Sequence, residues 1–177
     1  MDFAKFLELL FFPSNVILLV FLLLIYNSFA LMSVVDILVY GLAVIGFPIG
    51  FIIMNRRAKR KNRAGLLSIL IVMLIFSFLS LIFESLRNLR FLYFSIYSYL
   101  ILGLTMFAIR YRWKVSLHVS AFTTSAVILT IFNQNFVCLF LLIPLIAWSR
   151  IKLKMHTFYQ TLAGFAIGLV IPIIFFL

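Results

Sequence analysis

The chain has 177 residues, of which 66% are hydrophobic and only 11% are charged. A soluble domain has about 45–50% apolar and about 25% charged residues, so this composition excludes the soluble globular, disordered and fibrous classes. The 15 Lys and Arg residues outnumber four acids and give a formal net charge of +11. A single cysteine, Cys138, excludes an internal disulfide and a cysteine-based metal site. We therefore expect a polytopic membrane protein that forms one domain over residues 1–177.

Residues 1–12 form the first expected element, separate from the spans that follow. Asp2, Lys5 and Glu8 recur at every third position among phenylalanines and leucines, which is the pattern of an amphipathic helix. A helix with one apolar face is expected to lie in the membrane interface. Pro13 and the two polar residues after it end this helix and cap the next one.

Seven apolar stretches follow, each close to the roughly 20 helical residues that a bilayer core of about 30 Å requires. They cover approximately residues 14–31, 34–54, 65–84, 91–109, 115–132, 136–149 and 159–177. The sixth stretch is short and contains Pro144, and only two residues separate the first two stretches. The sequence thus predicts an all-α, polytopic membrane bundle of six to seven transmembrane helices with an N-terminal amphipathic interfacial helix.

Basic residues are divided unevenly between the two ends of these helices. With seven spans, the N-terminus and the loops near 55–63, 110–114 and 150–156 share one face, which holds every Lys and Arg except Arg87 and Arg90. The positive-inside rule places this basic face in the cytoplasm. The excess persists when the four cations that are candidates to bind a ligand are left out. Because the basic residues flank spans rather than cover a folded face, nucleic-acid binding is not expected.

Two short segments at the basic face combine a histidine with a serine and a cation. The fifth span begins with Lys-Val-Ser-Leu-His at residues 114–118, and the sixth ends with Ser-Arg at 149–150, followed by His156. Such side chains are costly at a membrane boundary unless they are used. Alternatively, both histidines are interfacial and the cations contact lipid headgroups. Their matched surroundings favour a shared site.

The spacing Ser149-Arg150-x5-His156 resembles the third motif, Ser-Arg-x5-His-x3-Asp, of the type 2 phosphatidic acid phosphatase and vanadium haloperoxidase superfamily. The similarity extends over residues about 55–160. Gln160 stands where the family has the aspartate that holds the histidine. Neither acid in the middle of the chain is expected to replace it, because both are predicted near the opposite face.

The other two motifs of this superfamily have weaker counterparts, in the family's order. Ser116-Leu117-His118 is similar to the second motif, Pro-Ser-Gly-His, with leucine in place of glycine. Arg56-x6-Arg63 is similar to the first motif, Lys-x6-Arg-Pro, with arginine for lysine and without the proline.

The resemblance implies a metal-independent lipid phosphate phosphatase that uses no cofactor. His156 would attack phosphorus and form a phosphohistidine, His118 would protonate the leaving alcohol and then activate water, and Gln160 would orient His156. The expected phosphate-binding residues are Arg56, Arg63, Lys114, Ser116 and Arg150. A site at the membrane mouth suits phosphatidic acid, phosphatidylglycerol phosphate or polyprenyl phosphates and diphosphates. Four acids in the whole chain argue against a two-metal cluster.

Three other functions are compatible with the same sequence. If an alcohol replaced water, the same histidine would make the chain a phosphotransferase. Gln160 and Leu117 instead suit a catalytically dead protein that binds or transports an anion or lipid. A plain basic membrane scaffold is the remaining interpretation, and it predicts that the motif loops do not meet.

Overall fold

Helices account for all regular secondary structure in the part of the chain that the computed structural model describes, which is residues 2–28, 34, 90–110 and 112–176. They are α1 (Phe3–Leu10), α2 (Pro13–Ser28), α5 (Arg90–Arg110), α6 (Leu117–Phe132), the 3-10 helix η3 (Gln134–Leu142), α7 (Ile143–Lys152) and α8 (Phe158–Phe176). The predicted all-α class is confirmed over these residues. The expected spans 34–54 and 65–84, with Arg56 and Arg63 between them, lie outside the described residues.

Two helical runs in the described part are long and apolar enough to cross a membrane. One is Gln134–Lys152, which η3 and α7 form together, and the other is α8. The pair α1 and α2 gives a third if the 46° bend between them is counted within one span. These runs make the chain a membrane protein. The described residues thus supply two or three spans, fewer than the six to seven that the sequence predicts for the whole chain. The apolar helix α6 is not among them because it has only 16 residues.

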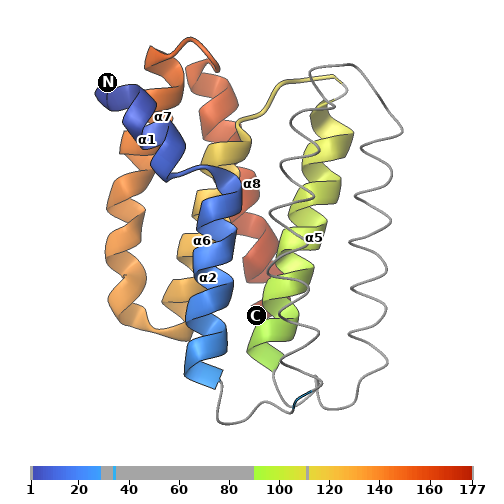
Figure 1. Ribbon diagram of the computed structural model, residues 1–177. Helices are drawn as coiled ribbons and strands as arrows, with labels where there is room; N and C mark the ends of the chain where they lie inside the picture. Colours follow the sequence, from blue (N-terminus) through green and yellow to red (C-terminus); the bar gives the residue numbers. More distant parts are fainter. Residues whose placement is uncertain (1, 29–33, 35–89, 111, 177) are drawn as a thin grey trace.

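Helix α5, helix α6, the η3–α7 run and helix α8 follow one another in alternating directions, so their connections gather at two ends of the bundle (Figure 1). The N-terminus, the α5–α6 connection and the α7–α8 connection lie at one end, and the C-terminus lies toward the other. The loops near 110–114 and 150–156 therefore share a face, as the sequence predicts. The two segments that carry the histidine motifs meet at this end.

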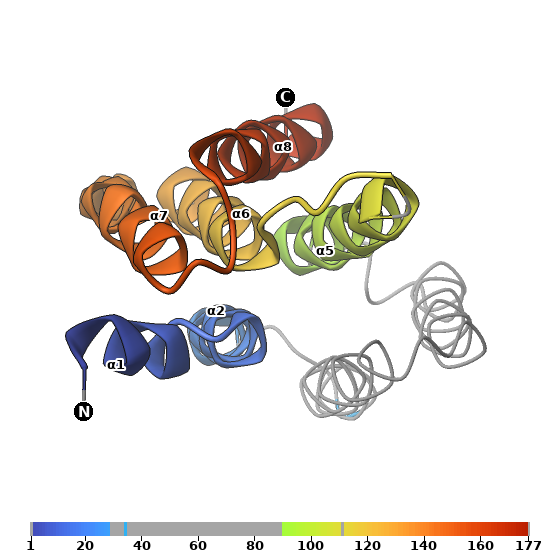
Figure 2. The same cartoon turned by 90° about the horizontal axis from the view of Figure 1, so that it is seen from above.

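Helix α6 lies at the centre of the described bundle, with α2, α5, α7 and α8 around it (Figure 2). Residues 119–129 of α6 are all buried, as expected for a helix that is surrounded by other helices. Two of its buried hydroxyl residues bond to the helix's own backbone: Thr123 Oγ1 donates to the Val119 carbonyl at 2.8 Å, and Ser125 Oγ donates to the Ala121 carbonyl at 2.8 Å.

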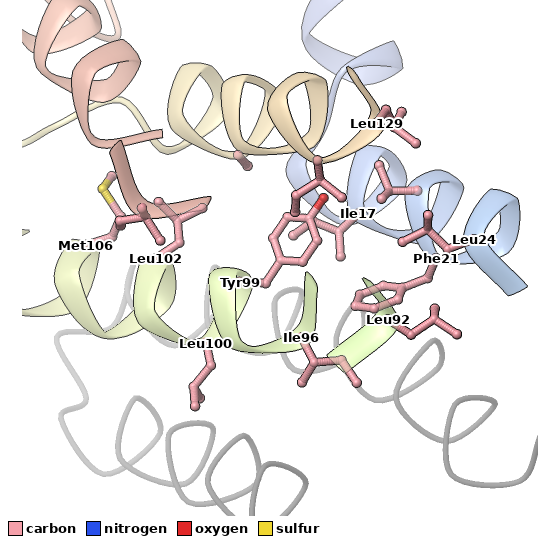
Figure 3. Packing of buried hydrophobic residues seen from close by; sticks show 14 of the residues in the cluster. Ile17, Phe21, Leu24, Leu92, Ile96, Tyr99, Leu100, Leu102, Met106 and Leu129 are labelled. Atoms are coloured by element: carbon pink, nitrogen blue, oxygen red, sulfur yellow. The ribbon is translucent and has the colours of Figure 1, made fainter. Parts of the chain in front are cut away.

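The main hydrophobic core fills the space between α2, α5 and α6 (Figure 3). Ile17, Phe21 and Leu24 of α2 belong to this core together with Tyr99 of α5. The Tyr99 ring packs 5.6 Å from the Phe21 ring, and its hydroxyl lies 2.7 Å from Ser125 Oγ on α6. This hydrogen bond lets a tyrosine be buried without an unpaired hydroxyl.

Helices α6 and α8 are in close backbone contact at the two glycines of the Gly164-x-x-x-Gly168 pattern. A Cβ on Gly164 would lie 2.6 Å from the Ser116 carbonyl oxygen, and a Cβ on Gly168 would collide with the Ser120 carbonyl. The close approach lets Thr124 Oγ1 donate to the Gly168 carbonyl at 3.1 Å. Small residues thus bring the backbones together, as they do between membrane helices generally.

Helix α1 confirms the helix predicted over residues 1–12 and packs against α7 (Figures 1 and 2). The Asp2 side chain caps its first turn by accepting from the Ala4 amide at 3.4 Å. Ala4 and Leu7 are buried. Several large apolar side chains of α1 remain exposed, namely Phe3, Phe6, Leu9 and Leu10. These exposed apolar side chains are compatible with the membrane interface, and the interfacial location of α1 stays a prediction.

Candidate phosphate site at the basic end of the bundle

A tight turn after α7 determines the position of His156 relative to Arg150. The Met155 amide donates to the Arg150 carbonyl at 3.0 Å, and the Lys154 amide donates to the Ile151 carbonyl at 2.9 Å. These are the two bonds of a Schellman motif, with Lys154 in the left-handed conformation at φ 54°. The His156 amide also points to the Arg150 carbonyl, at 3.4 Å. The spacing Arg-x5-His therefore has a structural cause: the turn folds the histidine back toward the arginine.

Arg150 is the largest fully buried side chain in the described part of the protein, with 2% of its surface exposed. Its Nη1 lies 2.9 Å from Glu8 Oε1 on α1, and the Glu8 side chain is 31% exposed. The contact is an ion pair without hydrogen-bond alignment, and Arg150 Nε has no hydrogen-bond partner. A buried guanidinium needs a counter-charge because desolvation of an ion costs several kcal/mol. Glu8 supplies one.

The ring of His156 is held by a main-chain acceptor. Its Nδ1 lies 3.1 Å from the Lys114 carbonyl oxygen. Since a carbonyl oxygen only accepts, Nδ1 carries the proton in this contact and donates it. The lone pair of the neutral ring is then on Nε2, which is the nitrogen available for attack on an electrophile. Lys114 thus contributes its backbone to His156, while its side chain is exposed.

The surroundings of His156 favour the neutral, nucleophilic form of its ring. Burial lowers the pKa of His156 below its ordinary value, and the positive charges of Arg150 and Lys114 lower it further. Hydrogen bonds from the ring to the Lys114 carbonyl and to Gln160 oppose this lowering of the pKa. Desolvation is the largest of these effects, so the ring is unprotonated at neutral pH.

The start of α6 brings the second motif to the same place. The Ser116 amide donates to the Gln160 carbonyl at 3.1 Å, which ties the N-cap of α6 to the first turn of α8. Ser116 Oγ is fully buried and has no hydrogen-bond partner, and neither has His118 Nε2. His118 lies within electrostatic reach of both Arg150 and His156. The Phe12 ring contacts the His118 ring edge-on at 5.5 Å.

Gln160 has a role in helix capping that the sequence interpretation did not include. Its side-chain Oε1 accepts from the main-chain amide of Thr157 at 3.0 Å, and its main-chain amide donates to Thr157 Oγ1 at 3.4 Å. This reciprocal pair is a capping box, Thr-x-x-Gln, at the start of α8. The Nδ1 atom of His156 contacts the Lys114 carbonyl oxygen, while the side-chain oxygen of Gln160 accepts from the Thr157 amide. Orientation of His156 by Gln160 is therefore a secondary contribution.

The structure thus brings together most of the predicted site residues within the part it describes. The group consists of Lys114, Ser116, His118, Arg150, His156 and Gln160. Glu8 joins this group although the sequence interpretation did not select it. Its only signal in the sequence was an acid at the face that is predicted to hold most of the cations.

Comparison with protein-family models, curated proteins and solved structures found no match for the chain. The functional conclusion consequently depends on the residues of this chain and their geometry.

Proposed function

We propose that the chain is an integral-membrane, metal-independent lipid phosphate phosphatase, a divergent member of the type 2 phosphatidic acid phosphatase superfamily. One observation supports the proposal above all. Ser116 Oγ, His118 Nε2 and Arg150 Nε are buried near His156 without hydrogen-bond partners. Unpartnered buried polar atoms are rare in folded proteins and cost about 1–3 kcal/mol each. A phosphate group carries enough acceptor oxygens to satisfy all three.

Charge and helix geometry add to this complementarity for a phosphate. The Ser116 hydroxyl stands at the N-terminus of α6, where the free amides and the helix dipole favour an anion. Arg150 supplies a full positive charge, and the Lys114 ammonium acts on the same site through space. Arg56 and Arg63 would complete the set of cations if the first motif lies at this end of the bundle.

Each residue then has a role in hydrolysis of the phosphate ester. His156 Nε2 attacks phosphorus, the P–O bond to the lipid alcohol breaks, and the phosphoryl group is transferred to the ring nitrogen. His118 donates a proton to the leaving alkoxide, and a phosphate dianion beside it supplies the counter-charge that a protonated ring needs. Deprotonated His118 then takes a proton from water as the water attacks the phosphohistidine. Inorganic phosphate leaves and His156 is regenerated.

The membrane location selects the class of substrate. The site lies at one end of helices that cross a bilayer, so a phosphate can bind there while acyl or isoprenoid chains stay among the lipids. Phosphatidic acid, phosphatidylglycerol phosphate and polyprenyl phosphates or diphosphates all have this form. We propose six to seven spans for the whole chain and a cytoplasmic position for the basic face, because the Lys and Arg excess lies there.

Release of inorganic phosphate from a panel of these lipids tests the proposal, with purified full-length protein in EDTA. Wild type is expected to release phosphate, and His156→Ala is expected to release none because the nucleophile is missing. Lys152→Ala is a matched control, since Lys152 is an exposed cation at the end of α7 that pairs with Asp2 at 3.7 Å. It should retain the wild-type rate. Equal rates for wild type and His156→Ala would contradict the proposal.

The acceptor of the His156 proton favours a second candidate, a protein that binds lipid phosphate without hydrolysis. In the superfamily this acceptor is a carboxylate, whereas here it is the neutral carbonyl of Lys114. A neutral acceptor fixes the tautomer but stabilises an imidazolium less well. Binding of orthovanadate together with no phosphate release from any lipid of the panel would favour this alternative.

A further inference from the structure

The contact between α1 and Arg150 assigns a function to the N-terminal helix that the phosphatase motifs do not include. Glu8 comes from an element outside all three motifs, yet its carboxylate reaches Arg150, the most deeply buried of the site's cations that the structure describes. The connector after α1 adds a second contact, because the Phe12 ring lies against the ring of His118. The N-terminal segment thus touches one residue of each histidine motif.

The atom of Arg150 that Glu8 contacts is informative. A guanidinium has two edges that can bind an oxyanion with two donors: the side formed by Nε and Nη2, and the end formed by Nη1 and Nη2. Nη1 lies on the side of Cδ, away from the Nε–H. Glu8 is 2.9 Å from Nη1, and Nε has no partner. Glu8 therefore occupies the far corner of the group and leaves the Nε edge open for a ligand.

Two effects of Glu8 on an anion oppose each other, and the geometry decides between them. A carboxylate near the site repels a phosphate, which would weaken binding. A carboxylate behind the guanidinium also holds a long, rotamer-rich side chain in one orientation, which removes an entropy cost from binding. Arg150 is 2% exposed, and Glu8 is at the corner of the guanidinium that faces away from its Nε edge. The positive charge of the guanidinium therefore lies between the carboxylate and the phosphate, so the gain from holding Arg150 in place outweighs the repulsion between the two anions.

We infer that Glu8 is a positioning residue, which holds Arg150 so that its Nε edge faces the phosphate of the ligand. The inference rests on the proposed function for the identity of the ligand, since it assigns Arg150 to the phosphate. It makes α1 part of the binding site rather than only a membrane anchor.

Orthovanadate is the probe for this inference, because it is a tetrahedral oxyanion that binds without a lipid chain. Its dissociation constant would be measured on the purified full-length chain in EDTA, for wild type, Glu8→Gln and Asp2→Asn. Glu8→Gln is expected to weaken orthovanadate binding about tenfold, because the Arg150 side chain is then no longer held in one orientation before the anion binds. The KM for a lipid phosphate should rise in parallel, with a smaller change in kcat.

Asp2→Asn is the matched control on the same helix. It removes the other acid of α1, whose exposed pair with Lys152 is 3.7 Å long, and asparagine still caps the helix. Orthovanadate binding should stay within about twofold of wild type. Wild-type or tighter binding by Glu8→Gln would overturn the inference, since Glu8 would then be idle or a competitor of the phosphate.

A double-mutant cycle separates positioning from a general effect on folding. Arg150→Lys removes the Nε edge, so Glu8→Gln in that background should weaken orthovanadate binding little further. Equal effects of Glu8→Gln in both backgrounds would show that Glu8 does not act through Arg150 and would overturn the inference. If Glu8→Gln does not fold, Glu8→Asp keeps the charge and withdraws it by one methylene group. Glu8→Asp should also weaken binding, and unchanged binding would overturn the inference.

The outcomes distinguish this inference from the proposed function. If the panel of lipid phosphates is hydrolysed while Glu8→Gln matches wild type, the inference fails and the phosphatase proposal stands. If orthovanadate binding depends on Glu8 while no lipid is hydrolysed, the positioning role stands and the phosphatase proposal fails. Wild-type protein that does not bind orthovanadate would contradict both.

Discussion

Gly164→Ala tests whether the packing of α6 on α8 holds the site in shape. The Cβ of an alanine at this position would lie 2.6 Å from the Ser116 carbonyl oxygen. A carbon and a carbonyl oxygen normally approach no closer than about 3.3 Å, so the two helices must separate by about 0.7 Å. Ser116 is the N-cap of α6, and His118 follows two residues later. The substitution therefore displaces the second motif relative to His156.

The expected effect on stability is small because two terms offset each other. Overpacking of this kind costs about 1–3 kcal/mol, whereas alanine favours a helix over glycine by about 1 kcal/mol. The expected effect on activity is larger. A misplacement of about 1 Å can cost 100-fold in rate, so a displacement of about 0.7 Å predicts a 10- to 100-fold lower kcat/KM.

The assay measures phosphate release from a detergent-solubilised lipid phosphate in EDTA, together with thermal unfolding of each variant. Ala166→Val is the matched control, because Ala166 is exposed on the same helix and gains atoms without a clash. It should keep the wild-type kcat/KM. Gly168→Ala should lower the unfolding temperature through its collision with the Ser120 carbonyl. A wild-type kcat/KM for Gly164→Ala would refute the argument that this close approach positions Ser116 and His118.

The remaining predictions concern His156 and the residues around it. Because burial lowers the pKa of His156, the nucleophilic form should persist below the ordinary value of 6.5, and the acid limb of kcat/KM against pH should fall at a lower pH than that. The free energy of unfolding should decrease as pH falls below 6.5, because His156 then takes up a proton in the unfolded chain but not in the folded one. His156→Ala should make this decrease smaller. Gln160→Glu keeps the capping box and adds a carboxylate, so it should move the acid limb to higher pH. If the acid limb of the pH profile does not move, residue 160 does not interact with the His156 ring. Lys154→Gly should stabilise the protein by about 1 kcal/mol, because glycine adopts the left-handed conformation without strain. Lys154→Ala removes the same charge but keeps the strain, so it should not stabilise the protein in thermal unfolding.

Hydrophobic length and spacing were sufficient to predict the helices of the described part. Their ends shifted by a few residues for local reasons. The stretch expected at 136–149 runs from Gln134 to Lys152 because Asn133 begins the next helix at once by accepting from the Asn135 amide. The helix expected at 115–132 starts only at Leu117, since the Ser116 amide is bound to α8 instead.

The residues of the site were predictable where a side chain carries the chemistry, and not where the backbone does. The motif spacing placed His118, Arg150 and His156 at one end of the bundle. The proton acceptor of His156 is a carbonyl group, which has no signature in a sequence because every residue has one. Glu8 was missed for another reason: its partner is distant in the chain, and only the packing of α1 on α7 brings the two together.

Detection of a phosphoryl group on His156 during turnover tests the central claim most directly. Wild-type protein would be mixed with a lipid phosphate in EDTA, denatured in alkali within the steady state, and its peptides analysed by mass spectrometry. Phosphohistidine is stable in alkali, so a phosphorylated peptide containing His156 is expected in wild type and not in His156→Ala. His118→Ala should accumulate the same peptide when the leaving group is an activated phenol, because attack by water then lacks its base. Release of inorganic phosphate without any phosphorylation of His156 in either protein would contradict the account.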